Sequence, residues 1–449
     1  MIEIALALNV IVFVAITATL FARGYLNIYS GLFIYVAFHF VAFVQRPVVV
    51  YLFDLRNAFD FMLYMPNDDV FVQTIVVANL GLVSFVLFYL YVLGFEPIAP
   101  SFDYIPVSAG QRRSFLLAFF LLSPFILYSF FLALTMRQAY GGEVFDELGK
   151  VNMTIDPTTG QHLFADTTAY IVNARDFAFA FSALMIHLTR GKWWSYLLVI
   201  FCAFVALQLG ERWAIVIAGL VAIMMTLYLK KRHSFTIFDY AAMAVVLGIF
   251  VVIGQNRDSV VRFFLTGEYD LNFDLAKSSF GDHPDFANFD FLTYVIGKVP
   301  DASGTYSYFT QYLGVFTQPI PRILWPGKPV GSPVQWVNLE AYGHFASLTT
   351  SLVGDGWISL GYAGVVITTG LVGAFYGWLF KRFCSPSVSI YFYCAHFWMV
   401  GLLLQWARDG GYKILDFSLF CIGPIILAYC INRIFFSRPQ GRPVLQQPR

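Results

Sequence analysis

Long apolar runs alternate along this chain with short polar stretches. A helix needs roughly 20 apolar residues to cross the hydrocarbon core of a bilayer, and the runs are near that length. The pattern predicts eleven membrane-spanning helices, at about residues 2–21, 28–44, 70–93, 114–134, 170–188, 195–209, 213–229, 235–253, 357–380, 387–406 and 414–431. It therefore predicts an all-α polytopic membrane protein, with residues 1–449 forming a single integral membrane domain.

The composition agrees with this fold class. Hydrophobic residues make up 59% of the chain and charged residues 12%, and the mean hydropathy is +0.68. Such a chain has too little charge for an ordinary soluble surface. The first run lacks a basic flank and a small-residue cleavage site, so we expect it to be a retained span. The five cysteines fall in or beside apolar runs and are expected to be buried free thiols.

Basic residues indicate the orientation of the spans, because lysine and arginine are retained on the cytoplasmic side. If the spans alternate, one face carries the clusters Arg23, Arg112–Arg113, Arg190 with Lys192, Lys230–Arg232, Lys381–Arg382 and the C-terminal arginines. The acids on that face are only Glu96, Asp103 and Asp239. The bias predicts a cytoplasmic C-terminus and an N-terminus on the outer side.

The outer side then holds three sizeable loops, at about 45–69, 135–169 and 254–356, while the inner loops are short. The last is too long for a simple connection. Its aromatic middle, about 291–317, is interrupted by polar residues and is predicted to form short helices at the membrane surface. The proline-rich tail, 437–449, is predicted to be a disordered cytoplasmic segment.

Arginines recur at the outer ends of the predicted spans, each beside an acid: Arg175–Asp176, Glu211–Arg212, Arg257–Asp258 and Arg408–Asp409. Each pair could simply neutralise itself at the interface. However, neighbours on a helix point roughly 100° apart, which disfavours a good fork between them. We therefore expect the guanidinium groups to point inward, where paired donors suit a phosphate group carried by a lipid.

The segment TQPIPRILWPGKPVGSP, residues 317–333, contains five prolines and cannot form a regular helix or strand. Irregular backbone at membrane depth is tolerated where it is buried in protein or lines a watery cavity. This predicts a rigid path that holds Arg322 and Lys328 as anion donors, with Trp325 as an interfacial anchor or a platform for a sugar ring. The alternative is that this loop has only a structural role and packs against the rest of the large outer region.

The remaining polar candidates are weaker. Asp355, between two glycines in SLVGDGWISLGYAG, is expected to be either the N-cap of the following span or a carboxylate facing the site. His39 and His187, in apolar runs, are predicted to be satisfied core histidines. His283 and His344 lack zinc-ligand spacing, so no metal is implied.

Two segments carry a family resemblance. IPRILWPGKP, followed after a short gap by SLTTSLVGDGWISLGYAGVV, resembles the Wzy-type oligosaccharide repeat-unit polymerases of O-antigen and enterobacterial common antigen synthesis. Those proteins carry an LWPG-(Lys/Arg)-P signature in a large periplasmic loop, and isolated arginines at the outer ends of spans. The resemblance covers roughly residues 170–415; the preceding residues match only in hydropathy.

The resemblance implies a GT-C-like, metal-independent glycosyltransferase of the bacterial inner membrane that uses no cofactor. Its donor would be a glycan on undecaprenyl pyrophosphate, and its acceptor an incoming lipid-linked repeat unit. A chain-length regulator and a flippase of the same pathway are possible partners. The arginines, with Arg322 and Lys328, would hold the pyrophosphate. Four groups remain unranked as the base that activates the acceptor hydroxyl: Asp409, Glu211, Asp355 and His344.

Two other functions stay open. An O-antigen ligase shares the lipid carrier, the arginines and the large loop, although the LWPGKP signature favours the polymerase. A lipid-linked oligosaccharide flippase would also be polytopic, but broken helices and cations near the membrane midplane would then be expected.

Overall fold

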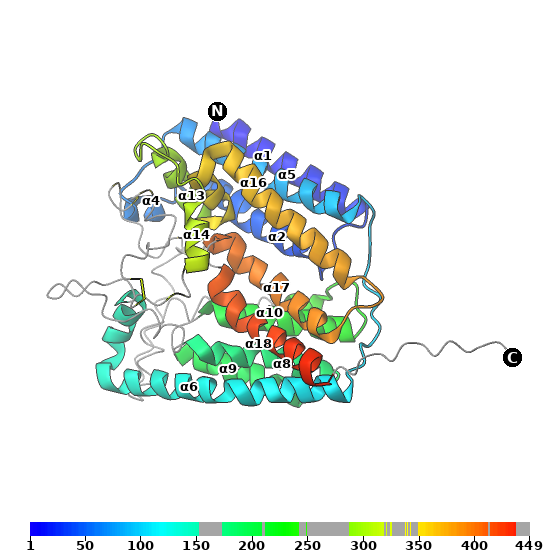
Figure 1. The fold of residues 1–449 in the computed structure, drawn as a ribbon. Helices are drawn as coiled ribbons and strands as arrows, with labels where there is room; N and C mark the ends of the chain where they lie inside the picture. The colour runs from blue at the N-terminus through cyan, green and yellow to red at the C-terminus, as the bar shows by residue number, and fades with distance from the viewer. Residues whose placement is uncertain are drawn as a thin grey trace.

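The computed structural model describes residues 1–151, 173–208, 212–241, 248, 287–317, 349–411 and 414–436, with 320, 324, 325, 337, 339 and 342. Every regular element in these residues is a helix (Figure 1). The α-helices are α1 (Ile2–Ala22), α2 (Gly31–His39), α3 (Arg46–Phe53), α4 (Asn57–Phe61), α5 (Asp68–Leu93), α6 (Ala109–Val151), α8 (Phe177–Leu188), α9 (Leu197–Gln208), α10 (Arg212–Leu229), α13 (Asn288–Lys298), α14 (Thr310–Thr317), α16 (Ser351–Phe383), α17 (Ile390–Asp409) and α18 (Ile414–Ile431). Short 3₁₀ segments, η2 (Asn173–Asp176) and η3 (Trp193–Tyr196), and π-helical segments, η1 (Phe40–Gln45) and η8 (Asn432–Phe436), join them.

Seven helices in the described residues are long and apolar enough to cross a membrane: Ile2–Ala22, Gly31–Phe53, Asp68–Leu93, Ala109–Phe131, Ser351–Phe383, Ile390–Asp409 and Ser418–Phe436. Trp193–Ala203 and Ile215–Leu229 are shorter apolar helices. The prediction of a helical membrane protein is therefore confirmed. Most of the predicted eighth span, 235–253, and the tail, 437–449, lie outside the described residues.

The helices run between two ends of the molecule (Figure 1). At one end, α13 contacts α3, α4, α5 and the start of α16; we call this the large-loop end. At the other, Tyr29 Oη donates to the carbonyl of Arg232 at 2.6 Å, and Lys381 Nζ donates to the carbonyl of Val92 at 3.2 Å. This second end holds the predicted basic clusters, and we call it the basic end. These two contacts bring together loops that the alternation of spans predicts to lie on one side.

Three predicted boundaries are wrong. The second span does not end at 44 but continues through η1 and α3 to Phe53, so that Arg46 lies within a helical run. The outer segment 135–169 does not begin as a loop, because α6 is helical to Val151. The ninth span begins at Ser351 and is kinked at Leu360 and Gly361. Hydropathy failed here because it detects apolar runs, whereas a helix continues wherever its backbone groups remain paired.

Local sequence explains several helix ends. Asn67 accepts a hydrogen bond from the backbone N–H of Val70 at 2.8 Å and caps the start of α5. Ser30 and Ser389 cap α2 and α17 in the same way. Gly94, with φ +87°, ends α5 in the left-handed conformation that glycine adopts without strain.

The closest helix pair is α5 and α16, which lie side by side in Figure 1. A Cβ on Gly377 would lie 2.7 Å from the carbonyl oxygen of Tyr89, and a Cβ on Gly373 would overlap the carbonyl of Phe85. Small residues four apart let two membrane helices approach to backbone contact. The second half of α16 is therefore packed at backbone contact against α5.

The predicted short helices of the large loop are present as α13 and α14, but α13 does not lie on a surface. Phe289, Phe291, Leu292, Tyr294 and Val295 are all fully buried. They form a second hydrophobic core with Phe71, Val353 and Trp357. Asp290 and Thr293 of the same helix are also fully buried, so protein covers α13 on all sides. Part of the large loop is therefore built into the end of the bundle.

The predicted core histidines differ from each other. His187 is buried, and its Nε2 lies 2.9 Å from the carbonyl of Ile105, as expected for a satisfied core residue. His39 is also fully buried, but neither ring nitrogen has a hydrogen-bond partner in the described chain. Its neighbours are rings, including Phe13 and Phe43. The prediction that His39 is satisfied is therefore wrong. The five cysteines are free, as predicted, but the prediction that all are buried is wrong, since Cys384 is partly exposed and Cys430 is exposed.

Candidate functional site

A buried carboxylate, Asp355, lies where the first turns of α16 meet the end of α17. It is fully buried. Thr350 Oγ1 donates to Asp355 Oδ1 at 2.8 Å, and the backbone N–H of Gly411 donates to Oδ2 at 2.5 Å. Tyr312 Oη, on α14, lies 3.5 Å from Oδ2. The N-cap alternative for Asp355 is wrong, because α16 begins at Ser351 and the N-cap residue is Thr350.

The kink in α16 places Asp355 at this position. Leu360 and Gly361 have non-helical backbone angles, and Gly361 has a φ of +56°, which favours glycine. A Cβ on Gly364 would overlap the carbonyl of Gly356, and a Cβ on Gly356 would lie 2.7 Å from Val365 Cα. The first segment of α16 therefore folds against the start of the second, and it presents Asp355 to α17. Of the two glycines beside Asp355, Gly356 makes this close approach, as the sequence indicated, whereas a Cβ on Gly354 would make only ordinary contacts.

Arg408 and Asp409 form the last turn of α17. Arg408 is only 8% exposed, so the prediction that its guanidinium lies inward is confirmed. The two neighbours do not form a two-bond fork, as predicted, but they are in contact: Arg408 Nη1 lies 3.0 Å from Asp409 Oδ1. The angle of roughly 100° between helix neighbours applies to the directions of their Cα–Cβ bonds. The arginine side chain is long enough to bend around the end of the helix and reach the neighbouring carboxylate. Gln405 Nε2 donates to the other carboxylate oxygen of Asp409 at 3.2 Å.

Polar side chains from two other segments satisfy the end of α17. Asn288 Nδ2, at the start of α13, donates to the carbonyl of Arg408 at 3.0 Å. Thr350 Oγ1 lies 3.2 Å from the carbonyl of Asp409. The last carbonyls of a helix need such partners when they are buried. We call Asn288, Thr350, Asp355, Arg408 and Asp409 the polar cluster.

Tyr312 connects α14 to the polar cluster. Ser307 Oγ donates to Gln311 Oε1 at 2.6 Å, and Gln311 Nε2 donates to Ser359 Oγ at 2.6 Å. These buried bonds fix α14 on the first segment of α16. Burial raises the pKa of Tyr312 well above its ordinary value of 10, and the Asp355 carboxylate adds to the rise. The phenol therefore remains protonated at neutral pH and is a donor for Asp355.

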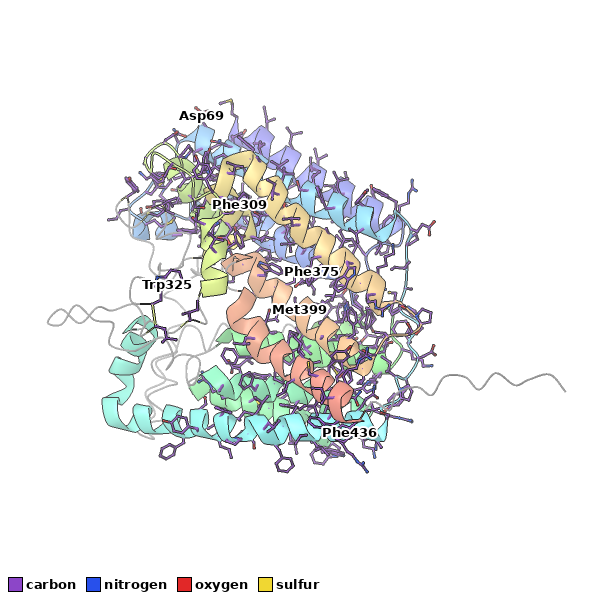
Figure 2. The ribbon with its side chains drawn as sticks, in the orientation of Figure 1. Asp69, Phe309, Trp325, Phe375, Met399 and Phe436 are labelled. Atoms are coloured by element: carbon purple, nitrogen blue, oxygen red, sulfur yellow. The ribbon has the colours of Figure 1, made fainter. Side chains whose placement is uncertain are left out.

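An apolar groove of about 420 Å³ adjoins the polar cluster. Its walls come from α14, α16 and α17, and they include Tyr312, Ile367, Thr368, Leu371, Phe375 and Trp406. Ile367 and Leu371 are 42% and 63% exposed, so the groove opens on the outer surface of the helices. Figure 2 shows Phe309 at its α14 side and Phe375 farther along α16. Its volume is within the range of ligand sites.

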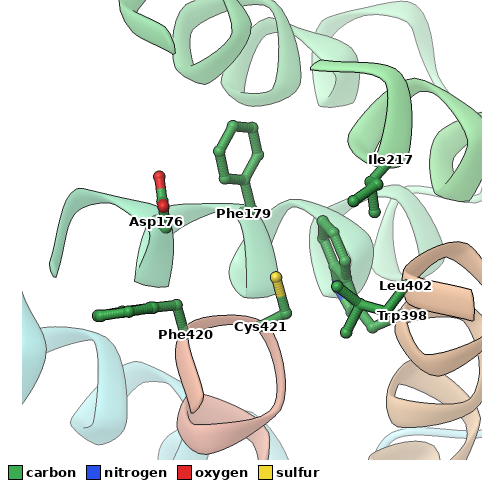
Figure 3. Close-up of a pocket in the computed structure, with 7 residues that line it drawn as sticks. All are labelled: Asp176, Phe179, Ile217, Trp398, Leu402, Phe420 and Cys421. Carbon is green, nitrogen blue, oxygen red and sulfur yellow. The ribbon is translucent and has the colours of Figure 1, made fainter. Parts of the chain in front are cut away.

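Arg175 lies in η2, before α8, and is 4% exposed, so its inward position is also confirmed. Its backbone N–H donates to Ser129 Oγ of α6 at 3.2 Å. The neighbouring Asp176 lines a small cavity with Phe179, Trp398, Leu402 and Cys421 (Figure 3). At about 20 Å³, this cavity has room for about one water molecule.

A buried ion pair that the sequence did not indicate lies close to the polar cluster. Arg46 Nε and Nη2 donate to the two carboxylate oxygens of Asp290 at 2.8 and 3.2 Å. The side chains are 2% and 0% exposed. The pair joins α3 to α13, and Asn288 of the polar cluster lies two residues before Asp290. The only sequence signal was an arginine directly after an apolar run, in VQRPVV.

Several predicted site residues cannot be placed. Arg257, Arg322, Lys328, His344 and Glu211 lie outside the described residues. Arg212 is the first residue of α10, but its side chain is not described. Trp325 is described; it is 40% exposed and lies at the large-loop end (Figure 2).

The described site thus combines one buried cation, two carboxylates and a groove with apolar walls. Such a combination suits an amphipathic ligand that carries an anionic group. Comparison with known proteins adds nothing to this geometry: no family model, curated protein or solved structure matches the chain.

Proposed function

We propose that this protein polymerises glycan repeat units carried on undecaprenyl pyrophosphate, at the periplasmic face of a bacterial inner membrane. The sequence basis is the LWPGKP segment and the isolated arginines, which resemble those of Wzy-type polymerases. The structural observation that supports it best is the burial of Arg408 beside Asp409 at the end of a span. Burying a guanidinium is costly, and such residues in membrane proteins mark binding or transport sites.

The two side chains suit two different parts of the reaction. A guanidinium is a planar group with five N–H donors, and this arrangement suits a phosphate group, which accepts two parallel hydrogen bonds. Arg408 would bind the donor pyrophosphate and stabilise the charge that develops as it leaves. The acceptor sugar hydroxyl attacks the anomeric carbon of the donor glycan. A new glycosidic bond forms, the bond to the pyrophosphate oxygen breaks, and the lipid pyrophosphate leaves with the electron pair.

Asp409 is the better base among the described carboxylates. Both carboxylates accept hydrogen bonds, Asp409 from Arg408 and Gln405 and Asp355 from Thr350 and Gly411. They differ in exposure: the side chain of Asp409 is 11% exposed, whereas Asp355 is fully buried. Asp409 would therefore take the proton from the acceptor hydroxyl, while Asp355 would hold the loop after α17 in place. Glu211 and His344 remain alternatives.

The proposal includes the finer topology: eleven spans in a GT-C-like arrangement, with the N-terminus and the large-loop end periplasmic and the C-terminus cytoplasmic. Two exposed positions in a cysteine-free background test the orientation. A membrane-impermeant maleimide should label Leu63→Cys, at the large-loop end, in intact spheroplasts. It should label Lys231→Cys, at the basic end, only after the membrane is permeabilised. The reverse pattern would exclude a periplasmic site.

Deletion of the gene tests the function. The surface polysaccharide of the deletion strain, run on a gel, should show chains with a single repeat unit, and the wild-type gene should restore the ladder. Lipid A core without any repeat unit would instead indicate a ligase. An unchanged ladder would reject both transferase functions. A flippase is disfavoured by the position of Arg408 and Asp409 at the end of a span, since a transport site lies near the midplane.

A further inference from the structure

Two helix ends at the basic end bring four cations together. α8 ends at Leu188 and α10 ends at Leu229, and a Cβ on Gly191 would lie 3.9 Å from Leu229 Cδ1. Tyr196 Oη, in η3, lies 2.6 Å from Thr226 Oγ1 of α10 and joins the two segments. The loop after α8 and the end of α10 therefore form one surface. We call its four cations the cationic patch: Arg190, Lys192, Lys230 and Lys231.

The cationic patch is exposed, and neighbouring acids do not neutralise it. All four residues are exposed, and none forms an ion pair within the described part of the chain. Asp239 is already hydrogen-bonded to Arg232 and to the backbone N–H of Thr236. Asp103 is exposed and also has no ion pair among the described residues. The C-terminus of a helix carries about half a negative charge, so four cations outweigh Asp103 and the ends of α8 and α10 together.

The backbone and a ring contact hold two of these cations in place. Arg190 and Lys231 lie in the left-handed region, with φ of +56° and +55°. This conformation costs free energy for a residue with a Cβ, so glycine is the usual residue at such a helix end. The Arg190 guanidinium lies over the ring of Tyr104 at 4.7 Å, and this contact uses its flat face. At both helix ends the chain thus carries a cation where glycine would be less strained.

Exposed apolar side chains continue from the cationic patch along the span. Trp193 and Trp194 directly follow Lys192 and are 76% and 40% exposed. Tryptophan is enriched at the depth where lipid headgroups meet hydrocarbon. Beyond them, residues three and four apart expose one face of α9, namely Leu197, Ile200 and Phe201. An occupant that covers the whole surface therefore carries an anionic group next to apolar chains.

We propose that this surface binds an anionic phospholipid of the leaflet at the basic end. Its phosphate lies at the cationic patch, and its acyl chains lie along Trp193 and the exposed face of α9. Cations beside a span favour an anionic headgroup over a zwitterionic one. The apolar face adds contact but no such preference, because it is in contact with hydrocarbon in either case. The site is at the opposite end of the bundle from the polar cluster and does not depend on the proposed function.

Photocrosslinking locates the lipid on the full-length protein, in nanodiscs with equal amounts of phosphatidylglycerol and phosphatidylcholine that carry the same acyl chains. A benzophenone amino acid at Trp193, which is 76% exposed, should capture phosphatidylglycerol several times more often than phosphatidylcholine. The matched control is Phe21, 77% exposed on α1 at the same end and beside Arg23; there the two lipids should be captured nearly equally. Equal capture of the two lipids at Trp193, or the same preference at both positions, would overturn the proposal.

Removal of charge tests the cationic patch. The double variant Lys192→Gln, Lys230→Gln should weaken binding of phosphatidylglycerol roughly thirtyfold, the effect of two cations at a membrane surface. Native mass spectrometry of lipid titrations would measure it, and binding of phosphatidylcholine should not change. The control Arg23→Gln, Arg382→Gln removes two exposed cations of the same end from other helices and should keep the wild-type affinity. Unchanged affinity in the first variant, or equal loss in both, would reject a localised site.

A soluble headgroup distinguishes a lipid site from a site for phosphate alone. Glycerophosphoglycerol has the headgroup of phosphatidylglycerol without the acyl chains, so it should not displace the lipid at equal concentration. Displacement at equal concentration would contradict the proposal, because the face of α9 would then contribute nothing. These measurements do not involve the surface polysaccharide, so their outcome is separate from that of the deletion test.

Discussion

The two ends of the helix bundle hold charged side chains differently. At the large-loop end, the ion pairs Arg46–Asp290 and Arg408–Asp409 are almost completely buried, and Asp355 is fully buried. At the basic end, the pair Arg232–Asp239 is 38% and 20% exposed. The guanidinium of Arg190 there lies over the ring of Tyr104 at 4.7 Å. Not every charged pair at the large-loop end is buried, since the pair Arg56–Asp54 is well exposed.

The difference indicates where the molecule uses its charges. Exposed cations at the basic end suffice to orient a membrane protein, because the orienting effect depends on charge and not on burial. A buried pair contributes little or no net stability relative to apolar residues, since the loss of hydration offsets its attraction. The buried charges at the large-loop end therefore call for another explanation, and binding of an anionic ligand supplies one.

The largest effect is expected from Arg408. Arg408→Ala should lower polymer formation by about a hundredfold or more, the usual cost of losing one donor that acts on a developing charge. Arg408→Lys should restore little, because a point charge replaces a planar group with several donors. Polymer length and amount would be measured on gels after complementation of the deletion strain, at matched protein levels.

The control for Arg408 is Arg232→Ala at the basic end, which removes the same charge from a partly exposed pair. It should leave the amount of polymer nearly unchanged. If both variants lose polymer equally, the difference between the two ends has no functional meaning. Normal polymer in Arg408→Lys would mean that only the charge of this residue matters.

A loss of stability is expected from Asp290. Asp290→Asn removes the carboxylate that both Arg46 donors contact, and breaking a buried pair costs about 3 kcal/mol. The fraction of protein that stays folded on heating in detergent would measure it. Asp239→Asn, in the exposed pair, should cause no measurable change. The double variant Arg46→Met, Asp290→Leu should recover most of the loss; if it is as unstable as Asp290→Asn, the buried charge of Arg46 is not the cause.

The sequence predicted the parts of this fold that depend on local pattern. Apolar runs predicted the helices, and the alternation of basic clusters predicted which loops share an end. The glycines around Asp355 predicted a close backbone approach. Each of these signals lies within a few residues of the structure that it specifies. They were correct where short-range packing and hydropathy decide the conformation.

The remaining features depend on residues that are far apart in the sequence. Arg46 and Asp290 are 244 positions apart, and no local sequence pattern near either residue indicates that the two are in contact. The direction in which the first segment of α16 folds depends on its contacts with α14 and α17. Arg408 was correctly predicted to lie inward, but its pairing with Asp409 depends on how a long side chain bends at a helix end. Single-sequence patterns carry no information on such contacts.

The smallest effect is expected from Tyr312, the donor that links α14 to Asp355. Tyr312→Phe should lower stability at pH 8 by about 1 kcal/mol, the typical value of one hydrogen bond.

Because the pKa of Tyr312 is raised in the folded protein, its proton is retained there and lost from the unfolded chain as the pH rises above 10. The advantage of the wild type is therefore present below pH 10 and shrinks above it. Melting temperatures of both proteins at pH 8 and pH 10.5 would measure the difference, and the other tyrosines cancel because both proteins contain them. A stability difference that stays constant between pH 8 and pH 10.5 would mean that the pKa of Tyr312 is not raised in the folded protein. The bond between Gln311 and Ser359 would then be the contact that holds α14 on α16.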